Sequence, residues 1–449
     1  MENAKKRWNV SPSLKILIGF LALILLGAFL LCLPIVNSDG QWLKFSSAFF
    51  TSTSAVCVTG MAVVDISMQF NIGGQIIILI LIQIGGLGVV AITSLLALLM
   101  GKKINLSGRL TLQESLNRDS IEGVVSTLKK ILLLTLSIEI VGALCLLYST
   151  INITGSVGYG IFTAIFLSIS AFCNAGIDIL GVYGGEFSSL TSFASNTLLL
   201  LPIAMLVILG SLGFIVLFNA FKPLKGKQHI KVVLLSTCIL LVGGTVAFLA
   251  LEWNNPNTLG NLSVMDKIVN AFFQATTLRT AGFATISQSS LTTGGQILSI
   301  ILMLIGGSPN STAGGLKTTT VLILLLFLFS KPNEKGDITF RQRRISSKIV
   351  RKAIKIFLSQ LCVLILSILL ITIVDGDIGI SAIVYECVSA ITTTGVGMGV
   401  TRTLTTFSKT ILCLLMFVGR VGLITIGIAV TQNPTTADFE YQNTDIIVG

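Results

Sequence analysis

The sequence predicts an all-α polytopic membrane protein, built from four parallel helix–re-entrant loop–helix repeats with eight transmembrane spans around a pseudo-fourfold axis. Three observations predict this fold. The 449-residue chain is 53% hydrophobic and only 11% charged, and it contains several apolar runs long enough to cross a bilayer. A seven-residue motif that ends in glycine recurs four times at even spacing. Basic residues gather on one side of the predicted spans.

The repeated motif consists of two small residues, three variable positions, a small residue and then glycine. Its copies are residues 54–60 (SAVCVTG), 170–176 (SAFCNAG), 276–282 (TTLRTAG) and 389–395 (SAITTTG). The final glycines, Gly60, Gly176, Gly282 and Gly395, lie 116, 106 and 113 residues apart. Four gap-free copies at such spacing indicate internal repeats.

Each repeat contains a long apolar segment, a short one that carries the motif, and a second long one. The first segments span 16–36, 128–149, 231–251 and 353–374; the short ones span 45–58, 160–172, 268–277 and 381–392; the last span 75–100, 196–221, 296–330 and 409–431. The short segments cannot cross a bilayer, so we expect re-entrant half-helices. With two crossings each, the repeats 1–101, 102–222, 223–332 and 333–449 are parallel, unlike the inverted repeats of many secondary transporters.

The distribution of charge predicts the topology. Of the 30 Lys and Arg residues, 23 lie in the N-terminal segment or in the loops 101–130, 222–231 and 331–355. This positive-inside bias places both termini in the cytoplasm. The net charge of +11 is therefore a consequence of topology and does not indicate nucleic-acid binding. For the basic loop 331–352, a docking role and a purely topological one both stay open.

The composition argues against catalysis. The eight cysteines lie almost entirely in apolar segments without a C-x-x-C pair, which is typical of packing residues. His229 is the only histidine, so a histidine-based metal site or catalytic triad cannot form. A transporter that alternates access would be expected to show inverted repeats or paired intramembrane acids, and neither is evident. A structural scaffold would not need re-entrant segments.

The ends of the four motifs form a candidate selectivity filter. It comprises Val58, Thr59, Gly60, Asn174, Ala175, Gly176, Thr280, Ala281, Gly282, Thr393, Thr394 and Gly395. Irregular backbone at membrane depth must be buried or line a wet cavity. There its carbonyl oxygens can replace the hydration shell of an ion, and glycine permits the backbone angles that aim them inward. Neutral oxygens favour a weakly hydrated monovalent cation.

Several alternatives accompany this hypothesis. A single copy of the motif would more simply be a helix-packing motif, which is our interpretation of the glycine clusters 85–88 and 210–213. Asp65 and Asp178, just beyond two of the glycines, either attract cations to the outer mouth or are ordinary solvated loop acids.

A second unusual stretch, residues 306–317, interrupts the second long segment of the third repeat. Pro309 and four glycines cannot continue a helix, so we predict an intramembrane gate. A loop outside the bilayer would leave two halves too short to cross. The candidate gate residues are Gly306, Gly307, Ser308, Pro309, Asn310, Ser311, Thr312, Ala313, Gly314, Gly315, Lys317 and Arg420.

Arg420, Arg279 and Glu139 are charged residues at predicted membrane depth. Arg420, near the middle of the segment 409–431, carries an insertion penalty of about 2.5–3.5 kcal/mol and should therefore face a cavity or a partner. We favour a role in the pathway over a purely structural one between helices. Arg279 is expected to brace the filter from behind. For Glu139, inter-helix hydrogen bonding and a functional role stay open.

These residues resemble the Trk/Ktr/HKT superfamily of potassium transporters, and more narrowly its bacterial Ktr-type membrane subunit. The resemblance covers nearly the whole chain, and it is carried by residues 53–60, 279–283, 306–308, 311–315 and Arg420. It implies potassium uptake across the bacterial cell membrane, with four filter glycines above the gate. The fourth loop, 392–397, and Asn310 depart from the residues common in Ktr relatives.

The resemblance also implies partners. It implies a homodimer with one pore in each subunit and a cytoplasmic nucleotide-binding regulatory ring. K⁺ would be the transported ion, Na⁺ an activator, and the nucleotide would bind only to the partner.

Overall fold

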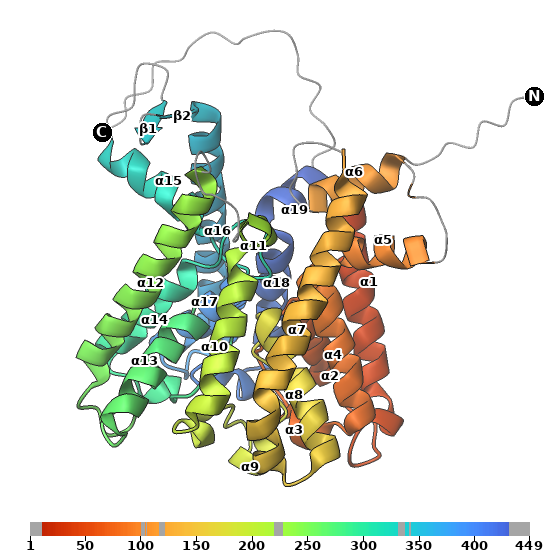
Figure 1. The fold of residues 1–449 in the computed structure, drawn as a ribbon, viewed down its shortest axis with the longest axis vertical. Coiled ribbons are helices and arrows are strands. Elements are labelled where there is room, and N and C mark those ends of the chain that lie inside the picture. The colour runs from red at the N-terminus through yellow and green to blue at the C-terminus, as the bar shows by residue number, and fades with distance from the viewer. Residues whose placement is uncertain are drawn as a thin grey trace, which may run out of the picture.

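The computed structural model describes residues 11–99, 104, 106–115, 122–219, 228–330, 337–340 and 343–430. Within these residues the chain is a bundle of helices with one small two-stranded sheet (Figure 1). The basic N-terminal residues 1–10 and the polar tail 432–449, both predicted to be cytoplasmic, lie outside the described residues.

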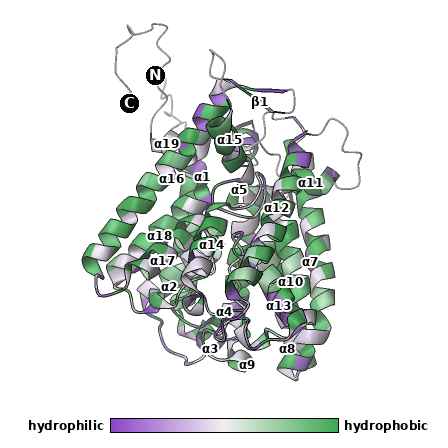
Figure 2. Ribbon diagram, turned by 90° about the vertical axis from the view of Figure 1, so that its left-hand side faces the viewer, coloured by the Kyte–Doolittle hydropathy of each residue, from purple (hydrophilic) through white to green (hydrophobic). Residues whose placement is uncertain are grey.

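Four helices of the described chain are individually long and apolar enough to cross a membrane. They are α1 (Pro12–Cys32), α7 (Val124–Thr154), α12 (Gln228–Glu252) and α16 (Ser347–Val374). Each coincides with the first apolar segment of a repeat, so these four predictions are confirmed. Hydrophobic residues dominate their length in Figure 2.

The four short segments also form helices where they were expected. These are α2 (Phe45–Val56), α8 (Val157–Phe172), α13 (Val264–Thr277) and α17 (Ile380–Thr392). At a rise of about 1.5 Å per residue, none reaches the roughly 30 Å of a hydrocarbon core. Each packs against the long helix that precedes it. Ala48, Phe166, Ala271 and Cys387, one from each helix, are fully buried.

The second long segments were predicted as membrane spans, and the sequence indicated a break only in the third repeat. All four are divided: α4 (Ile72–Leu87) from α5 (Val89–Leu99), α10 (Thr197–Leu212) from α11 (Phe214–Asn219), α14 (Thr293–Leu304) from α15 (Thr318–Phe329), and α18 (Thr406–Val421) from α19 (Leu423–Val430). The first pair bends by 101° and can count as a fifth, broken span.

A single glycine with positive φ causes three of these breaks. Gly88, Gly213 and Gly422 have φ of 93°, 86° and 89°, which end a right-handed helix and which other residues rarely adopt. The packing interpretation holds for the earlier members of two clusters, because a Cβ on Gly85 or Gly210 would overlap a backbone carbonyl of a short helix. That interpretation did not predict the helix break at the last glycine of each cluster.

Local capping explains where the second helices begin. Asn71, Asn196, Thr292 and Thr405 each accept a hydrogen bond from the backbone N–H three residues later. A side-chain oxygen at this position satisfies one of the free donors of the first turn.

Short elements lie at both ends of the bundle (Figure 1). At one end lie the short helices α3 (Ile66–Gln69) and α9 (Gly181–Gly184). The connections also contain four single 3-10 turns, which are η1 (Pro34–Val36), η2 (Thr191–Phe193), η3 (Gln288–Ser290) and η4 (Val400–Arg402). At the other end lie α6 (Leu106–Ser115), which α1 contacts where Lys15 donates to Ser107, and the hairpin.

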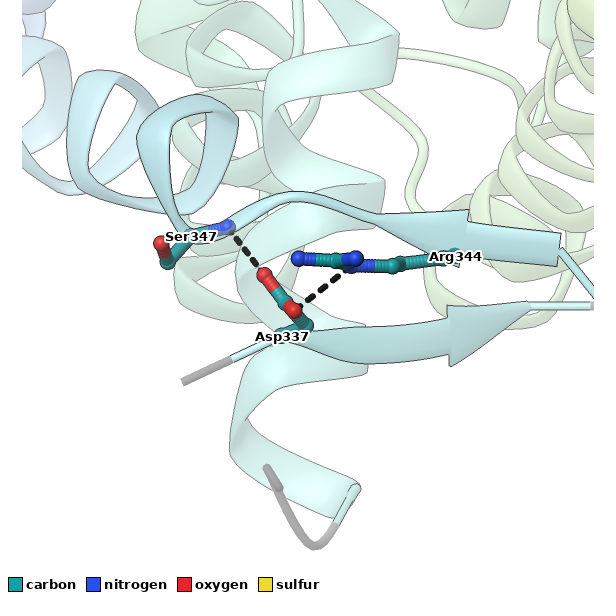
Figure 3. Close-up of polar contacts among 3 residues, drawn as sticks. All are labelled: Asp337, Arg344 and Ser347. Atoms are coloured by element: carbon teal, nitrogen blue, oxygen red, sulfur yellow. Dashed lines mark hydrogen bonds and ion pairs between the residues drawn. The ribbon is translucent and has the colours of Figure 1, made fainter. Parts of the chain in front are cut away.

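The hairpin corrects the all-α prediction. Strands β1 (Ile338–Phe340) and β2 (Arg343–Ile345) pair antiparallel within the basic loop. An isolated hairpin is marginally stable, so it needs a tether. Asp337 supplies one: its buried carboxylate forms an ion pair with Arg344 Nε at 2.6 Å and accepts a hydrogen bond from the backbone N–H of Ser347 at 2.8 Å (Figure 3).

Candidate functional site

The four glycine loops share one backbone conformation. Two residues before each glycine, Val58, Asn174, Thr280 and Thr393 have φ of 54°, 59°, 67° and 53°. The glycines Gly60, Gly176, Gly282 and Gly395 have φ of 94°, 62°, 99° and 90°. A non-glycine residue at positive φ is uncommon and strained, and such strain concentrates at functional sites. The same alternation in four different sequences shows that the motif encodes a backbone shape.

The four loops close into a ring. Each glycine faces the carbonyl oxygen of the residue before the next glycine. The neighbours are Gly60 with Ala175, Gly176 with Ala281, Gly282 with Thr394, and Gly395 with Thr59. A Cβ on Gly60 would lie 2.5 Å from its carbonyl neighbour and one on Gly282 would lie 2.7 Å away, so neither position has room for a side chain. The structure therefore brings the predicted filter glycines together in cyclic order.

A small residue at the first or second position of each motif braces its loop. Ser54 Oγ and Ser389 Oγ accept hydrogen bonds from the N–H of the loop glycine at 3.1 and 2.9 Å. Ser170 accepts one from Ile177 N at 3.0 Å, and Thr277 donates to the Phe283 carbonyl at 2.6 Å. The conformation is thus held from behind the ring.

The helices that lead into the ring have a common polarity. All four short helices end three to five residues before their glycine. The C-terminus of a helix carries roughly half a negative charge. The ring consequently lies where four partial negative charges converge, which favours a cation without any formal charge in the loops.

Loop side chains play different roles. The hydroxyls of Thr59 and Thr280 are buried and have no hydrogen-bond partner within the described residues. The Thr394 hydroxyl bonds instead to Thr392 at 2.8 Å. Asn174, with its amide oriented to suit its neighbours, donates to the carbonyls of Val207 and Ala171. Asn174 therefore supports the second loop.

A cavity of about 180 Å³ lies on one side of the ring, and all four glycines line it. Asp65 and Asp178 line it too, together with Glu386 of α17. Asp65 also caps α3 through Ser67 N at 2.9 Å, so it is not a freely solvated acid. Burial raises the pKa of Asp178 to about 6.

Glu386 was missed by the sequence analysis. It accepts hydrogen bonds from Met398 N at 3.1 Å and Thr401 Oγ1 at 2.9 Å, which anchors the chain beyond Gly395. An acid inside an otherwise apolar short segment was the feature that could have revealed it.

The break between α14 and α15 packs against the second repeat. A parallel bridge between Ile305 and Leu316 closes its base. Its backbone N–H groups at Ser308 and Thr312 donate to the carbonyls of Ser211 and Gly210, at 3.0 and 3.2 Å. The Thr312 hydroxyl also donates to the Phe172 carbonyl at the end of α8, at 3.0 Å. The predicted gate segment thus lies against a helix that leads into the ring.

Arg420 joins this segment to other repeats. Its guanidinium donates to the carbonyls of Thr312, Gly85 and Gly86, the last at 2.8 Å. Lys317 donates to the Ala313 carbonyl at 2.6 Å. Arg420 lies in the last turn of α18, before Gly422, and not in the middle of a continuous helix as the sequence suggested.

A second cavity, of about 610 Å³, is bounded by this network. Asn310, Ser311, Lys317 and Arg420 line it together with residues of α1, α6, α7 and α11. The first cavity contacts the ring glycines and the second contacts the gate segment.

Glu139 and Arg279, which the sequence placed at membrane depth, are both buried. Glu139 accepts a hydrogen bond from Gln83 at 3.1 Å, which supports the inter-helix interpretation. The Arg279 guanidinium has no hydrogen-bond partner within the described residues. Its predicted bracing of the filter stays a prediction.

The sequence was compared with profiles of known protein families. The family profile TrkH, described as cation transport protein, matches residues 12–441. This chain belongs to the TrkH family. The family resemblance seen in the sequence is confirmed.

Two curated relatives cover almost the full length. The Ktr system potassium uptake protein B of Bacillus subtilis is 36% identical over 425 residues, with 93% of each chain covered. The potassium/sodium uptake protein NtpJ of Enterococcus hirae is 37% identical over 451 residues, with 99% of this chain and 98% of the relative covered. The crystal structure of the potassium transporter TrkH from Vibrio parahaemolyticus matches with a TM-score of 0.71 at 18% identity, covering 96% of this chain and 87% of that one, which supports the fold.

Proposed function

We propose that this chain carries potassium ions across the bacterial cell membrane into the cell, without catalysing a covalent reaction. The observation that carries the proposal is the cyclic contact of each loop glycine with the carbonyl of the next loop. Main-chain oxygens around an axis replace the hydration shell of a weakly hydrated monovalent cation. The names of the two full-length relatives, a potassium and a potassium/sodium uptake protein, support the ion.

The filter consists of the twelve loop residues named from the sequence, with Gly60, Gly176, Gly282 and Gly395 at its narrowest ring. The break between α14 and α15 is the gate, because it bounds the second cavity while Arg420 ties it to the first repeat. An ion would pass from the acidic cavity through the ring and then beside this segment.

The proposed topology has eight spans in four parallel repeats, with boundaries at 1–101, 102–222, 223–332 and 333–449. The short helices re-enter the membrane from the outer face. Both termini and the hairpin face the cytoplasm, in keeping with the positive-inside bias.

We further propose that the chain works as a homodimer with a cytoplasmic nucleotide-binding ring and that Na⁺ stimulates uptake. The partner ring is motivated by the name of one relative, which describes it as part of a Ktr system. The role of Na⁺ is motivated by the name of another, a potassium/sodium uptake protein. The nucleotide would bind to the ring and not to this chain.

Substitution of one ring glycine tests the filter. Gly60→Ser introduces a Cβ and a hydroxyl into a ring position that has no room for a side chain. We expect discrimination of K⁺ over Na⁺ to fall roughly tenfold, equivalent to about 1.4 kcal/mol. Uptake of both ions is measured in potassium-transport-deficient cells and in proteoliposomes.

Gly243→Ser is the matched control, because nothing lies within 4 Å of a Cβ at this α12 position. Unchanged relative uptake in a correctly inserted Gly60→Ser protein would contradict the filter assignment.

A further inference from the structure

The surface around the hairpin and the first turns of α16 carries an unusual concentration of cations. Arg343 and Arg344 on β2 are exposed, and so are Lys348, Arg351, Lys352 and Lys355 on α16. The four helical residues follow the spacing i, i+3, i+4, i+7 and therefore lie on one face. We name this surface, formed by these six residues, the basic stripe.

The cations of the stripe are largely unneutralised. Within the described residues, the ion pair between Arg344 and Asp337 is the only one that involves the stripe. Asp337 is buried and is already used to hold the hairpin on α16 (Figure 3). The hairpin therefore presents the stripe in a fixed geometry, and the cations on α16 form no ion pair with another of the described residues.

The position of these cations opposes helix stability. The N-terminus of a helix carries a partial positive charge, so acidic residues are favourable there and basic ones are not. The first turn of α16 contains no acid, and its N-cap Ser346 makes no side-chain capping bond. An anion bound beside this end would offset both the helix dipole and the charge of the exposed cations.

Topology alone requires fewer charges. The other first helices begin with one or two basic residues: Lys15 in α1, Lys129 and Lys130 in α7, and Lys231 in α12. Helix α16 has four basic residues among its first nine, which is more than the corresponding helix of any other repeat has.

The surroundings identify the ligand. The stripe on α16 is about 10 Å long, comparable to the polar layer of one leaflet, which is roughly 5–8 Å thick. Phe357, Leu358 and Leu361 follow on the same helix and are exposed, as are Ile365 and Leu369 further along. An anion that contacts cations and then a lipid-exposed apolar surface is an amphiphile.

We propose that the basic stripe binds the phosphate headgroup of anionic phospholipids in the cytoplasmic leaflet. The orientation follows the proposed topology, on which this inference rests. Bound lipid would fix the hairpin and the start of α16 at the membrane surface.

Lipid-dependent quenching of a local fluorophore tests the proposal. The full chain is prepared with Trp8, Trp42 and Trp253 replaced by Phe and with Phe357→Trp as the probe. It is placed in nanodiscs of phosphatidylcholine that contain an equal mole fraction of either brominated phosphatidylglycerol or brominated phosphatidylcholine. We expect the anionic lipid to quench the probe at least about threefold more strongly, because each cation near the surface favours anionic lipid.

The control probe is Leu133→Trp, an exposed α7 position at a similar distance from its helix start. Only two basic residues, Lys129 and Lys130, precede it in α7, so we expect a clearly weaker preference for the anionic lipid there. Combining Lys348→Gln, Arg351→Gln, Lys352→Gln and Lys355→Gln should abolish the preference at the first probe. Persistence of the preference in this variant would overturn the proposal.

Two further results would also overturn it. One is equal quenching by both lipids at the first probe in the unmodified stripe. The other is binding of a protein partner to the basic stripe when no preference for anionic lipid is seen. The ligand of the stripe would then be a regulatory ring. Potassium flux through the Phe357→Trp protein is measured in liposomes of the same lipids. Absent flux with an intact lipid preference would reject the proposed function and leave the lipid site standing.

Discussion

The four loops of the ring have the same backbone conformation in every repeat, whereas the four breaks in the second helices do not. In the ring, all four loops have positive φ at the same two positions. In the second helices, three repeats break at a single glycine, whereas the third inserts the segment between α14 and α15. The repeats are thus equivalent where the loops meet and unequal where the segment packs against α10.

This difference has a physical reason. A ring of carbonyls requires a contribution of the same geometry from each quarter, so every loop needs the same backbone shape. The proposed gate, in contrast, needs only one element able to change position. The segment 305–317 is anchored by a few hydrogen bonds, chiefly to α10 and Arg420, and such locally held segments are the ones that move.

The largest expected effect separates the two kinds of glycine. Gly395 and Gly422 have φ of 90° and 89°, so alanine introduces similar backbone strain at both. A Cβ on Gly395 would overlap the Thr59 carbonyl, whereas nothing lies within 4 Å of one on Gly422. We expect potassium uptake in Gly395→Ala to fall about 100-fold below that of Gly422→Ala, equivalent to about 2.7 kcal/mol. Comparable uptake by two equally expressed variants would show that ring packing is unimportant.

Shortening the proposed gate should raise potassium flux. Deletion of Asn310–Ala313 removes the Thr312 carbonyl that Arg420 contacts and leaves the bridge between Ile305 and Leu316. We expect roughly tenfold faster K⁺ entry into proteoliposomes, which corresponds to about 1.4 kcal/mol of barrier. Arg420→Gln, which removes the charge but keeps a donor, should give a smaller increase. Equal or lower flux in a correctly inserted deletion variant would argue against a gate.

A smaller effect is expected from the brace behind the fourth loop. Ser389→Ala removes the acceptor for Gly395 N–H, and an unsatisfied buried donor costs about 1–3 kcal/mol. We expect a severalfold loss of K⁺ over Na⁺ discrimination, measured by competition for rubidium uptake. Ser367→Ala is the control, since this hydroxyl bonds only to the Val363 carbonyl of its own helix. If both variants behave alike, the brace does not maintain selectivity.

The smallest expected effect is a pH dependence of uptake, from the cavity that we propose to be the outer mouth. Burial raises the pKa of Asp178 to about 6, so its negative charge is present above that pH and is lost as the external pH falls through it. We expect initial uptake at limiting K⁺ to fall about twofold between pH 7 and 5, because one cation-attracting charge disappears. Asp178→Asn should remove this component, and Asp377→Asn, on the exposed loop after α16, should retain it.

The sequence alone determined the repeat and its main elements. Apolar length predicts α1, α7, α12 and α16, because a bilayer imposes a minimum span. The small residues and glycine of the motif predict the loops, since only small side chains permit such close backbone approach. The break around Pro309 was predictable because that stretch cannot form a helix.

Tertiary structure decided what depends on partners distant in sequence. The breaks at Gly88, Gly213 and Gly422 were not predictable, because glycine in an apolar helix commonly serves packing and φ is set by the surroundings. The brace by Ser389 and the anchoring by Glu386 depend on contacts made after the chain turns back. The cyclic contact of Gly60 with Ala175 joins different repeats, so only the assembled bundle could establish it.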